Sequence, residues 1–334
     1  MNSVVYNKKI LITGGTGSIG SELAKYCHEN GAKLIKIFSN DENGLYEMEN
    51  SFPKSKKMQF VIGDVRDENT VDSITENIDI VFHAAALKHV DRCELHPIEA
   101  FSVNVNGTKN IIRFSIKNKI KKVILISTDK AVNPTGVMGA TKLLAEKMLS
   151  SESLNKNSKT VFSSVRFGNV IQSRGSIIPK IEKQILSGGP VTLTDLRMQR
   201  FFMSVDECVD LIIHATKLAK GGEVFVLKMP MLKLNDLFEC MKEVLAPKSG
   251  LDSKRIKTKV IGITPGEKIS EDLLTKFEME HAIETKDFFI IPPLLQKINT
   301  EFISKKNSKK VQQYFDNLQP LSKYKILKIL KKIY

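Results

Sequence analysis

The chain has 334 residues, of which 42% are hydrophobic and 26% are charged, and its formal net charge is +14 at pH 7. These proportions are typical of a globular protein with a sizeable core, and no apolar run approaches the roughly 20 residues of a membrane span, so we expect no stable membrane insertion. The basic residues are mostly dispersed lysines without interleaved aromatic residues, which argues for a solvated surface and against a nucleic-acid partner.

The first half of the chain alternates β-branched apolar runs with amphipathic segments. The runs cover residues 9–13, 33–39, 59–64, 79–85, 122–128 and 161–168. Apolar strands separated by helices predict a parallel sheet covered on both faces, and right-handed crossovers then give a Rossmann-type, doubly wound α/β fold. The first strand follows no signal-peptide pattern, and the four cysteines are scattered. We therefore expect a cytoplasmic protein with reduced thiols and no metal site.

The regularity weakens after residue 170, where short strand-like runs accompany helices predicted over 204–219 and 233–246. We predict a Rossmann domain over residues 1–170, a smaller mixed α/β lobe over 171–297 that returns segments to the main sheet, and a basic C-terminal tail over 298–334. The tail ends in "LSKYKILKILKKIY", which predicts a surface helix or a frayed end. A membrane-surface or oligomer contact is the alternative.

The segment "KKILITGGTGSIGSELAKYC" combines a strand, a glycine-rich turn and a helix. Gly14, Gly17 and Gly20 have the spacing that lets backbone approach a pyrophosphate and lets the helix pack on the strand. Amides at the start of the helix would meet the anion, and these belong to Thr16, Ser18 and Ile19. The segment therefore predicts a dinucleotide-binding site.

The ends of the next two strands are expected to meet the adenosine half of the dinucleotide. Ser39 and Asn40 lie at the tip of the second strand, with Asp41 beyond them. No acid occupies the tip itself, which favours NADP, and no arginine is present to clamp a 2′-phosphate, which leaves NAD open. After the third strand, Asp64 is predicted to hold the adenine amino group and Val65 its face. A helix N-cap is the alternative role for Asp64.

Several motifs taken together resemble one family of enzymes. They are "ITGGTGSIG", "GDVRD", "HAAALKHV", "NVNGTKN", "STDKAVNPTGVMGATK", "VRFGNVIQSRGSIIP", "TDLRMQRFFMS" and "PGEK". From about Lys8 to Pro293 the chain resembles the nucleotide-sugar dehydratases of the extended short-chain dehydrogenase/reductase superfamily, most closely the N-acetylglucosamine 4,6-dehydratase group. The glycine loop is shared by the whole superfamily, whereas the motifs that follow it are more specific.

The resemblance implies a reaction and its partners. UDP-N-acetylglucosamine would be oxidised at C4, lose water across C5 and C6, and recover the hydride at C6, giving a UDP-4-keto-6-deoxy-N-acetylhexosamine. The cofactor would be reduced and reoxidised within each turnover. The family also implies a homo-oligomer, from a dimer to a hexamer. The lobe over 171–297 would bind the nucleotide sugar.

The resemblance also assigns catalytic roles within "STDKAVNPTGVMGATK". Asp129 would donate a proton to the departing 6-hydroxyl, and Lys130 would take H5, which requires a pKa lowered by burial and by nearby Lys142. Lys142 would bind the nicotinamide ribose. Met138 replaces the tyrosine of the usual Tyr-x-x-x-Lys pair, so we hypothesise that Thr128, Asp129 or an ordered water takes the O4 proton instead. Two simpler roles remain open: a packing role for Met138, and an ion pair or helix cap for Asp129 and Lys130.

Other positions match the motifs of the family. Three residues would end the fourth strand against the cofactor: Ala84, Ala85 and Ala86. Asn104 is expected to bridge backbone near the active site. Seven residues are predicted to contact the substrate: Lys88, Asn169, Arg174, Ser176, Arg197, Arg200 and Glu267. Thr264 stands where the family often has arginine, and this weakens any inference about the nucleotide base.

Alternative functions stay open at this stage. GDP-N-acetylglucosamine is an alternative substrate for the same reaction, and the residues do not decide between inversion and retention at C5. A nucleotide-sugar 4-epimerase would use the same cofactor loop and lysine without elimination. Met138 alone also suggests a cofactor-binding sensor without catalysis.

Overall fold

The computed structural model describes residues 3–334 except 53–54, 156, 172 and 294–304. Its main sheet has the strand order β13-β14-β10-β6-β5-β4-β1-β2-β3. Six consecutive parallel strands form most of it: β1 (Lys9–Thr13), β2 (Leu34–Ser39), β3 (Met58–Ile62), β4 (Ile80–His83), β5 (Lys122–Thr128) and β6 (Val161–Phe167). The predicted Rossmann-type α/β fold is confirmed, and each predicted apolar run of the first half overlaps one of these strands.

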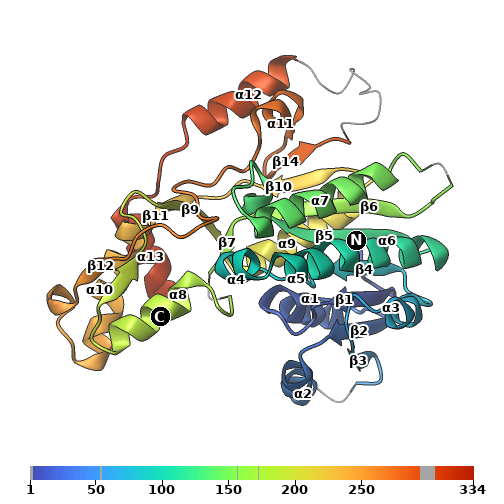
Figure 1. Ribbon diagram of the computed structural model, residues 1–334, viewed down its shortest axis with the longest axis horizontal. Helices are drawn as coiled ribbons and strands as arrows, with labels where there is room; N and C mark the ends of the chain where they lie inside the picture. Colours follow the sequence, from blue (N-terminus) through green and yellow to red (C-terminus); the bar gives the residue numbers. More distant parts are fainter. Residues whose placement is uncertain (1–2, 53–54, 156, 172, 294–304) are drawn as a thin grey trace.

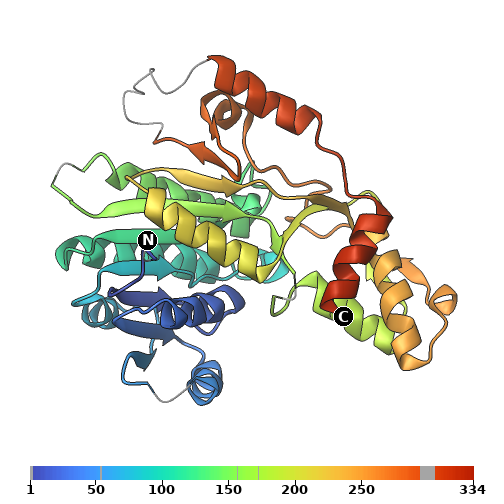
Figure 2. The ribbon, with the colours of Figure 1, turned by 180° about the vertical axis from the view of Figure 1, so that it is seen from behind.

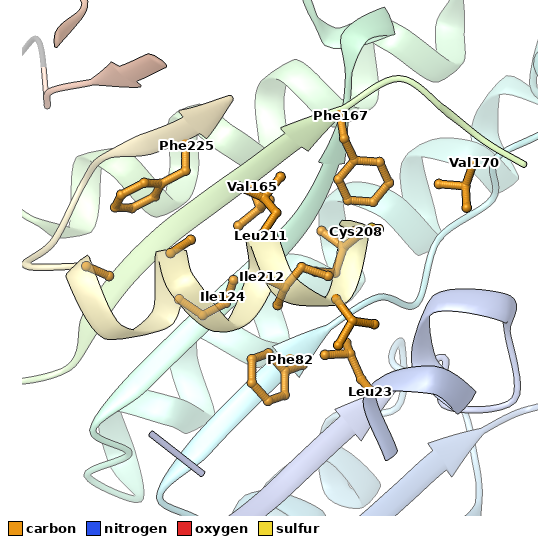
Figure 3. Packing of buried hydrophobic residues seen from close by; sticks show 14 of the residues in the cluster. Leu23, Phe82, Ile124, Val165, Phe167, Val170, Cys208, Leu211, Ile212 and Phe225 are labelled. Carbon is orange, nitrogen blue, oxygen red and sulfur yellow. The ribbon is translucent and has the colours of Figure 1, made fainter. Parts of the chain in front are cut away.

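Helices cover both faces of the sheet because alternate strand residues point to opposite sides. Ile10, Ile12 and Ile124 pack in the core that α1 (Ser18–Glu29) and α9 (Val205–Leu218) cover, whereas Leu11 and Val123 pack in the opposite core. Figure 3 shows the first of these cores, with Leu211 and Ile212 of α9 beside the sheet. The opposite face carries three helices: α3 (Glu68–Thr75), α6 (Gly107–Lys117) and α7 (Val137–Glu152). Figure 1 shows α6 and α7 on that face, and Figure 2 shows α9 on the other.

Three strands from beyond residue 170 extend the main sheet. β10 (Val224–Leu227) pairs parallel with β6, β14 (Phe288–Ile291) pairs antiparallel with β10, and β13 (Ile283–Glu284) forms the edge. The remaining strands make two small sheets: β7 (Asn169–Val170), β9 (Gln199–Met203) and β11 (Met231–Lys233) in one, and β8 (Val191–Leu193) and β12 (Thr258–Val260) in the other. Residues of β8, β9 and β11 form a separate core with α8 (Ile177–Leu186) and α10 (Leu234–Leu245), and Figure 1 shows these elements beside the main sheet.

The basic C-terminal segment is more integrated than the sequence suggested. In α13 (Lys323–Ile333), Ile326 and Leu330 are buried in the same core as α10. In α12 (Lys305–Asp316), the rings of Tyr314 and Phe315 contact Phe289 of β14. Over residues 309–334 these are surface helices, as the first alternative predicted, and each buries an apolar stripe; a frayed end is not found there. The first residues of the predicted tail, 298–304, lie outside the described residues.

The remaining helices are short or lie at the edges of the main sheet. They are α2 (Glu42–Ser51), α4 (Val90–Leu95), α5 (Pro97–Phe101), the π-helical turn Ser102–Asn106 and α11 (Lys276–His281). Across the described part of the chain, no helix combines the length and the apolar composition needed to cross a membrane.

Candidate active site

A cavity of about 590 Å³ lies at the carboxyl ends of β1, β4, β5 and β6. Doubly wound sheets bind their ligands at this edge. Every residue predicted to hold the dinucleotide lines the cavity: Gly14, Thr16, Gly17, Ser18, Ile19, Gly20, Ser39, Asn40, Asp64, Val65, Ala84, Ala85, Ala86 and Lys142. The glycine loop and the catalytic segment, more than 100 residues apart in the sequence, therefore line one cavity.

The glycines of the loop let its backbone pack closely against neighbouring backbone. Gly14 has a φ of +63°, and a Cβ there would lie 2.7 Å from the backbone nitrogen of Ala85. A Cβ on Gly20 would lie 2.5 Å from the carbonyl oxygen of Gly14. Helix α1 begins at Ser18, so its free amides and its positive dipole end face the cavity. This geometry fits the pyrophosphate of a dinucleotide.

A Gly14→Ala protein tests this fit. The added methyl group would clash with the backbone of Ala84 and Ala85 and would hold alanine in a left-handed conformation. We expect the affinity for the dinucleotide to fall at least ~10-fold, or about 1.4 kcal/mol. The measurement is the amount of dinucleotide extracted per purified chain. Gly250→Ala is the matched control, because Gly250 has a φ of +69° but a Cβ there would meet nothing within 4 Å. Equal dinucleotide content in both variants would refute the assignment.

The adenosine end of the cavity carries more negative charge than the strand tips suggested. The hydroxyl groups of Thr16 and Ser39 are 2.9 Å apart. Asp41, just beyond, also lines the cavity and accepts a hydrogen bond from the amide of Gly44 at the start of α2. A carboxylate at this place disfavours a 2′-phosphate.

Asp64 does not cap a helix in this structure. The N-cap of α3 is Asp67, whose side chain accepts a hydrogen bond from the amide of Asn69, so the alternative role for Asp64 is wrong. Asp64 instead accepts two hydrogen bonds from the guanidinium group of Arg66, of 2.9 and 2.6 Å, which lower the pKa of its carboxyl group. The carboxylate of Asp64 is therefore ionised where the chain leaves β3.

The predicted acid and base meet where β5 ends. Thr128 is the last residue of β5, and a 3-10 turn over Asp129–Ala131 follows it. Oδ1 of Asp129 accepts hydrogen bonds from Nζ of Lys130 at 2.9 Å and from the hydroxyl of Thr128 at 3.0 Å. Asp129 is fully buried and lies behind the cavity wall, whereas Thr128, Lys130 and Asn169 line the cavity. The ion pair that the sequence left open is present.

The expected lowered pKa of Lys130 is wrong. Burial alone would lower the pKa of Lys130, but the carboxylates of Asp129 and Glu271 raise it, and the net shift is upward. Lys142 has the opposite environment, because burial lowers its pKa to about 8 despite nearby Glu146. Its Nζ donates to the carbonyl oxygen of Ile126 at 2.6 Å. Lys142 is therefore expected to lose its proton at a lower pH than Lys130.

Met138 has a packing role as well as a place in the cavity wall. It is 4% exposed and belongs to a small apolar cluster with Cys93 and Ala100. Nearby, the amide group of Asn104 accepts from the backbone nitrogen of Leu87 at 2.8 Å and donates to the carbonyl oxygen of the same residue at 3.1 Å. The backbone bridge predicted for Asn104 is present.

The residues predicted to bind substrate fall into two groups. Three line the cavity: Lys88, Asn169 and Ser176. Beside them, the backbone of Arg174 connects two parts of the site, since its amide donates to the Ser18 hydroxyl and its carbonyl oxygen accepts from Lys88. The guanidinium group of Arg174 lies at the surface, 4.0 Å from Glu47.

The structure does not bring the second group into the cavity. Arg197 is at the surface and pairs with Asp195 at 2.8 Å. The guanidinium group of Arg200 donates to the carbonyl oxygens of Gln199, Lys268 and Ile269. Glu267 accepts a hydrogen bond from the amide of Thr264 in its own loop. Substrate contacts by Arg197, Arg200 and Glu267 stay predictions.

The sequence of this chain is similar to those of known proteins. The family described as polysaccharide biosynthesis protein matches residues 10–293. This chain belongs to that family. An uncharacterized membrane protein of Methanocaldococcus jannaschii is 48% identical over 98% of this chain and 96% of its own length. A UDP-glucose 4-epimerase of Rickettsia bellii is 39% identical over 86% of this chain and 83% of its own length.

Solved structures of similar proteins agree with the family. Pen from Bacillus thuringiensis is 40% identical, with a TM-score of 0.90 and 98% of each chain covered. DesIV, a dTDP-glucose 4,6-dehydratase from Streptomyces venezuelae with NAD and TYD bound, is 19% identical, with a TM-score of 0.71 and coverage of 92% of this chain and 97% of its own. At that identity the second likeness shows the fold alone. The chain is thus a member of a family in which a relative that is 39% identical is named UDP-glucose 4-epimerase.

Proposed function

We propose that this protein is a cytoplasmic, homo-oligomeric UDP-N-acetylglucosamine 4,6-dehydratase. The observation that carries the proposal is the contact of Thr128, Asp129 and Lys130 at the wall of a dinucleotide-sized cavity. A 4-epimerase needs a base for the 4-hydroxyl only, whereas dehydration also needs a base for H5 and an acid for the 6-hydroxyl. The aspartate and lysine supply this additional pair.

The bound nicotinamide dinucleotide, NAD or NADP, would supply an acceptor for the C4 hydride and return that hydride to C6. The glycine loop would hold its pyrophosphate and Lys142 its nicotinamide ribose. The absence of an acid at the tip of β2 favoured NADP, but the carboxylate of Asp41 in the cavity wall supports NAD. Extraction of the dinucleotide from purified protein decides between the two.

The proton balance explains how the enzyme works without a tyrosine at position 138. The product keeps a ketone at C4, so the proton from O4 does not return to the sugar. The departing 6-hydroxyl needs one proton to leave as water. Thr128, which lines the cavity, would pass the O4 proton to an ordered water and so to solvent, and the Asp129–Lys130 pair would supply the proton that the leaving group needs. The thioether of Met138 takes no part in the transfer.

The ion pair at rest is one proton transfer away from the reactive form. Moving a proton from the ammonium group of Lys130 to the carboxylate of Asp129, 2.9 Å away, gives a neutral amine and a carboxylic acid. The neutral amine would take H5 and later return a proton to C5. The acid would protonate the 6-hydroxyl through the hydroxyl of Thr128, which is bonded to Asp129 and belongs to a residue of the cavity wall, and the pair would then regain one proton from solvent. The pair thus keeps both groups available although the pKa of Lys130 is raised.

Incubation with UDP-N-acetylglucosamine in heavy water tests the proposal. We expect a product that has lost one water, carries a C4 ketone and has deuterium at C5 in its NMR spectrum. A parallel incubation with GDP-N-acetylglucosamine tests the alternative nucleotide, and the coupling constants at C5 report inversion or retention. Unchanged sugar nucleotide with no reduction of bound cofactor would instead support the non-catalytic sensor.

A 4-epimerase is the second candidate, because relatives in Rickettsia that are 38–39% identical are named UDP-glucose 4-epimerase. The same incubation separates the two reactions. An epimerase would give a C4 epimer of unchanged mass and would leave H5 in place.

Thr128→Val tests the route of the O4 proton. The substitution preserves the shape of the side chain and removes the hydroxyl that donates to Asp129. We expect the reduction of bound cofactor on mixing with substrate to slow about 100-fold, because a positioned proton carrier is lost. The measurement is stopped-flow absorbance of the reduced nicotinamide. Thr128→Ser keeps the hydroxyl and is expected to keep most of the rate. Wild-type rates in Thr128→Val would remove Thr128 from the route.

A further inference from the structure

A charged cluster lies behind Lys130, and Glu271 is at its centre. Oε1 of Glu271 is 3.6 Å from Nζ of Lys130 and 3.9 Å from Nε of Arg200. Oε2 is 3.7 Å from Nζ of Lys268. The Glu271 side chain is 3% exposed, so three cations surround one buried carboxylate. A buried charge is retained only where such partners compensate its desolvation.

Backbone contacts fix the place of this carboxylate. The loop that carries Glu271 is bonded to β9, because the amide of Gln199 donates to the carbonyl oxygen of Ile269 at 2.8 Å. Lys268 anchors the other side, since its Nζ donates to the carbonyl oxygen of Val132 at 2.6 Å. Glu271 is therefore held against Lys130 by groups from β9 and from the turn that follows β5.

Glu271 still has an unused acceptor. Its Oε2 is buried and has no hydrogen-bond partner within the described residues. Glu271, Lys130, Met138 and Lys268 also line a second, separate cavity of about 10 Å³. That volume is close to the space one water needs. Lys130 lines both cavities. Its Nζ donates to Oδ1 of Asn169 in the wall of the cavity of about 590 Å³, here called the sugar cavity, and has Glu271 as a further neighbour.

We propose that Glu271 is a positioning residue that holds the Lys130 amine at the wall of the sugar cavity and stabilises the ammonium group formed when Lys130 takes H5. Glu271 does not line the sugar cavity and transfers no proton to the sugar itself. The catalytic part of this inference rests on the proposed function. The ion-pairing part rests on the geometry of Glu271, Lys130 and their neighbours.

The charges around Lys130 determine how activity should change with pH. Asp129 and Glu271 raise the pKa of Lys130 against the effect of burial, and Arg200 opposes them. Lys268 is a further cation on the Glu271 carboxylate. The Asp129–Lys130 pair loses its shared proton when pH rises through the pKa of Lys130. Removing the charge of Glu271 lowers that pKa, so the alkaline loss of activity is expected at a lower pH.

The test compares Glu271→Gln with Asp272→Asn. Both substitutions turn a carboxylate into an amide, but Asp272 is exposed and its carboxylate contacts Asn133 instead of Lys130. The first measurement is an NMR titration of the Lys130 side chain in protein with ¹³C-labelled lysine, assigned by the signal lost in Lys130→Arg. In Glu271→Gln we expect the midpoint to fall by about one pH unit or more, and in Asp272→Asn we expect it to stay unchanged. An unchanged midpoint in Glu271→Gln would overturn the inference.

The second measurement separates two steps of the reaction. In Glu271→Gln the reduction of bound cofactor is expected to stay within about twofold of wild type, while deuterium incorporation at C5 falls about tenfold. An equal fall in both steps would show a merely structural role and contradict the proposal. Glu271→Asp keeps the charge and is expected to preserve the pH profile, which covers the case in which Glu271→Gln folds poorly. If wild type dehydrates no sugar nucleotide, the proposed function fails, and the titration still decides whether Glu271 controls Lys130.

Discussion

A Lys130→Gln protein is expected to reduce its bound cofactor when substrate is added and then to stop. Glutamine matches much of the length of lysine but accepts no proton from C5. Oxidation at C4 does not use this amine, because the O4 proton leaves through Thr128, whereas removal of H5 depends on the amine. We expect formation of the dehydrated product to fall about 1,000-fold, the range seen when a general base is lost.

The measurement follows absorbance of the reduced nicotinamide and the mass of the sugar nucleotide in one reaction. Accumulation of reduced cofactor with no loss of water from the sugar is the expected result. Lys228→Gln is the matched control, because Lys228 is also a largely buried lysine with a carboxylate partner, Glu284 at 2.6 Å, but it lies outside the cavity. Dehydration at the wild-type rate in Lys130→Gln would show that another group removes H5.

The main sheet could be predicted from the sequence because each of its parallel strands is a short apolar run that is recognisable by itself. In β5, Ile124 and Ile126 face one core while Val123 and Leu125 face the other, and such a doubly buried strand needs an apolar residue at every position. The glycine loop was predictable for the same reason, since its strand, turn and helix follow one another within 20 residues. All predicted cofactor residues reach the cavity because parallel strands end at a common edge.

Contacts between distant segments were not predictable in this way. Glu271 lies about 140 residues after Lys130 and in no motif, so no sequence pattern indicated that it would raise the pKa of that lysine. Arg200 was expected to bind a diphosphate because arginines often do, but its guanidinium group contacts three carbonyl oxygens. The amphipathic pattern of α13 indicated a helix correctly, but not that α10 would cover its apolar stripe.

Three buried charged residues form an ion network beside the active site. Arg166 in β6 is 1% exposed and pairs with Glu146 of α7 at 2.6 Å and with Glu278 of α11 at 3.1 Å. Glu146 also accepts a hydrogen bond of 2.5 Å from Ser127 in β5. The network thus joins the strand of the catalytic pair, the helix of Lys142 and the segment that follows Glu271.

Arg166→Met is expected to lower the free energy of unfolding by about 3–5 kcal/mol at pH 7, because it leaves two buried carboxylates without a cation. Burial alone would raise the pKa of Glu278, and the charge of Arg166 holds that pKa below its ordinary value. Without the arginine the pKa of Glu278 is expected to rise, so the loss of stability should be smaller near pH 4 than at pH 7. Urea denaturation at both pH values measures it.

The same network provides the controls for this stability prediction. A triple variant that adds Glu146→Gln and Glu278→Gln to Arg166→Met should recover part of the loss, since no buried charge remains unpaired. Arg113→Met removes an arginine that pairs with Glu68 at the surface, where the guanidinium side chain is 60% exposed, and it should cost less than about 1 kcal/mol. If Arg166→Met cost no more than Arg113→Met, the two carboxylates would have to be neutral in the native protein. The link between β5, α7 and α11 would then depend on packing instead of charge.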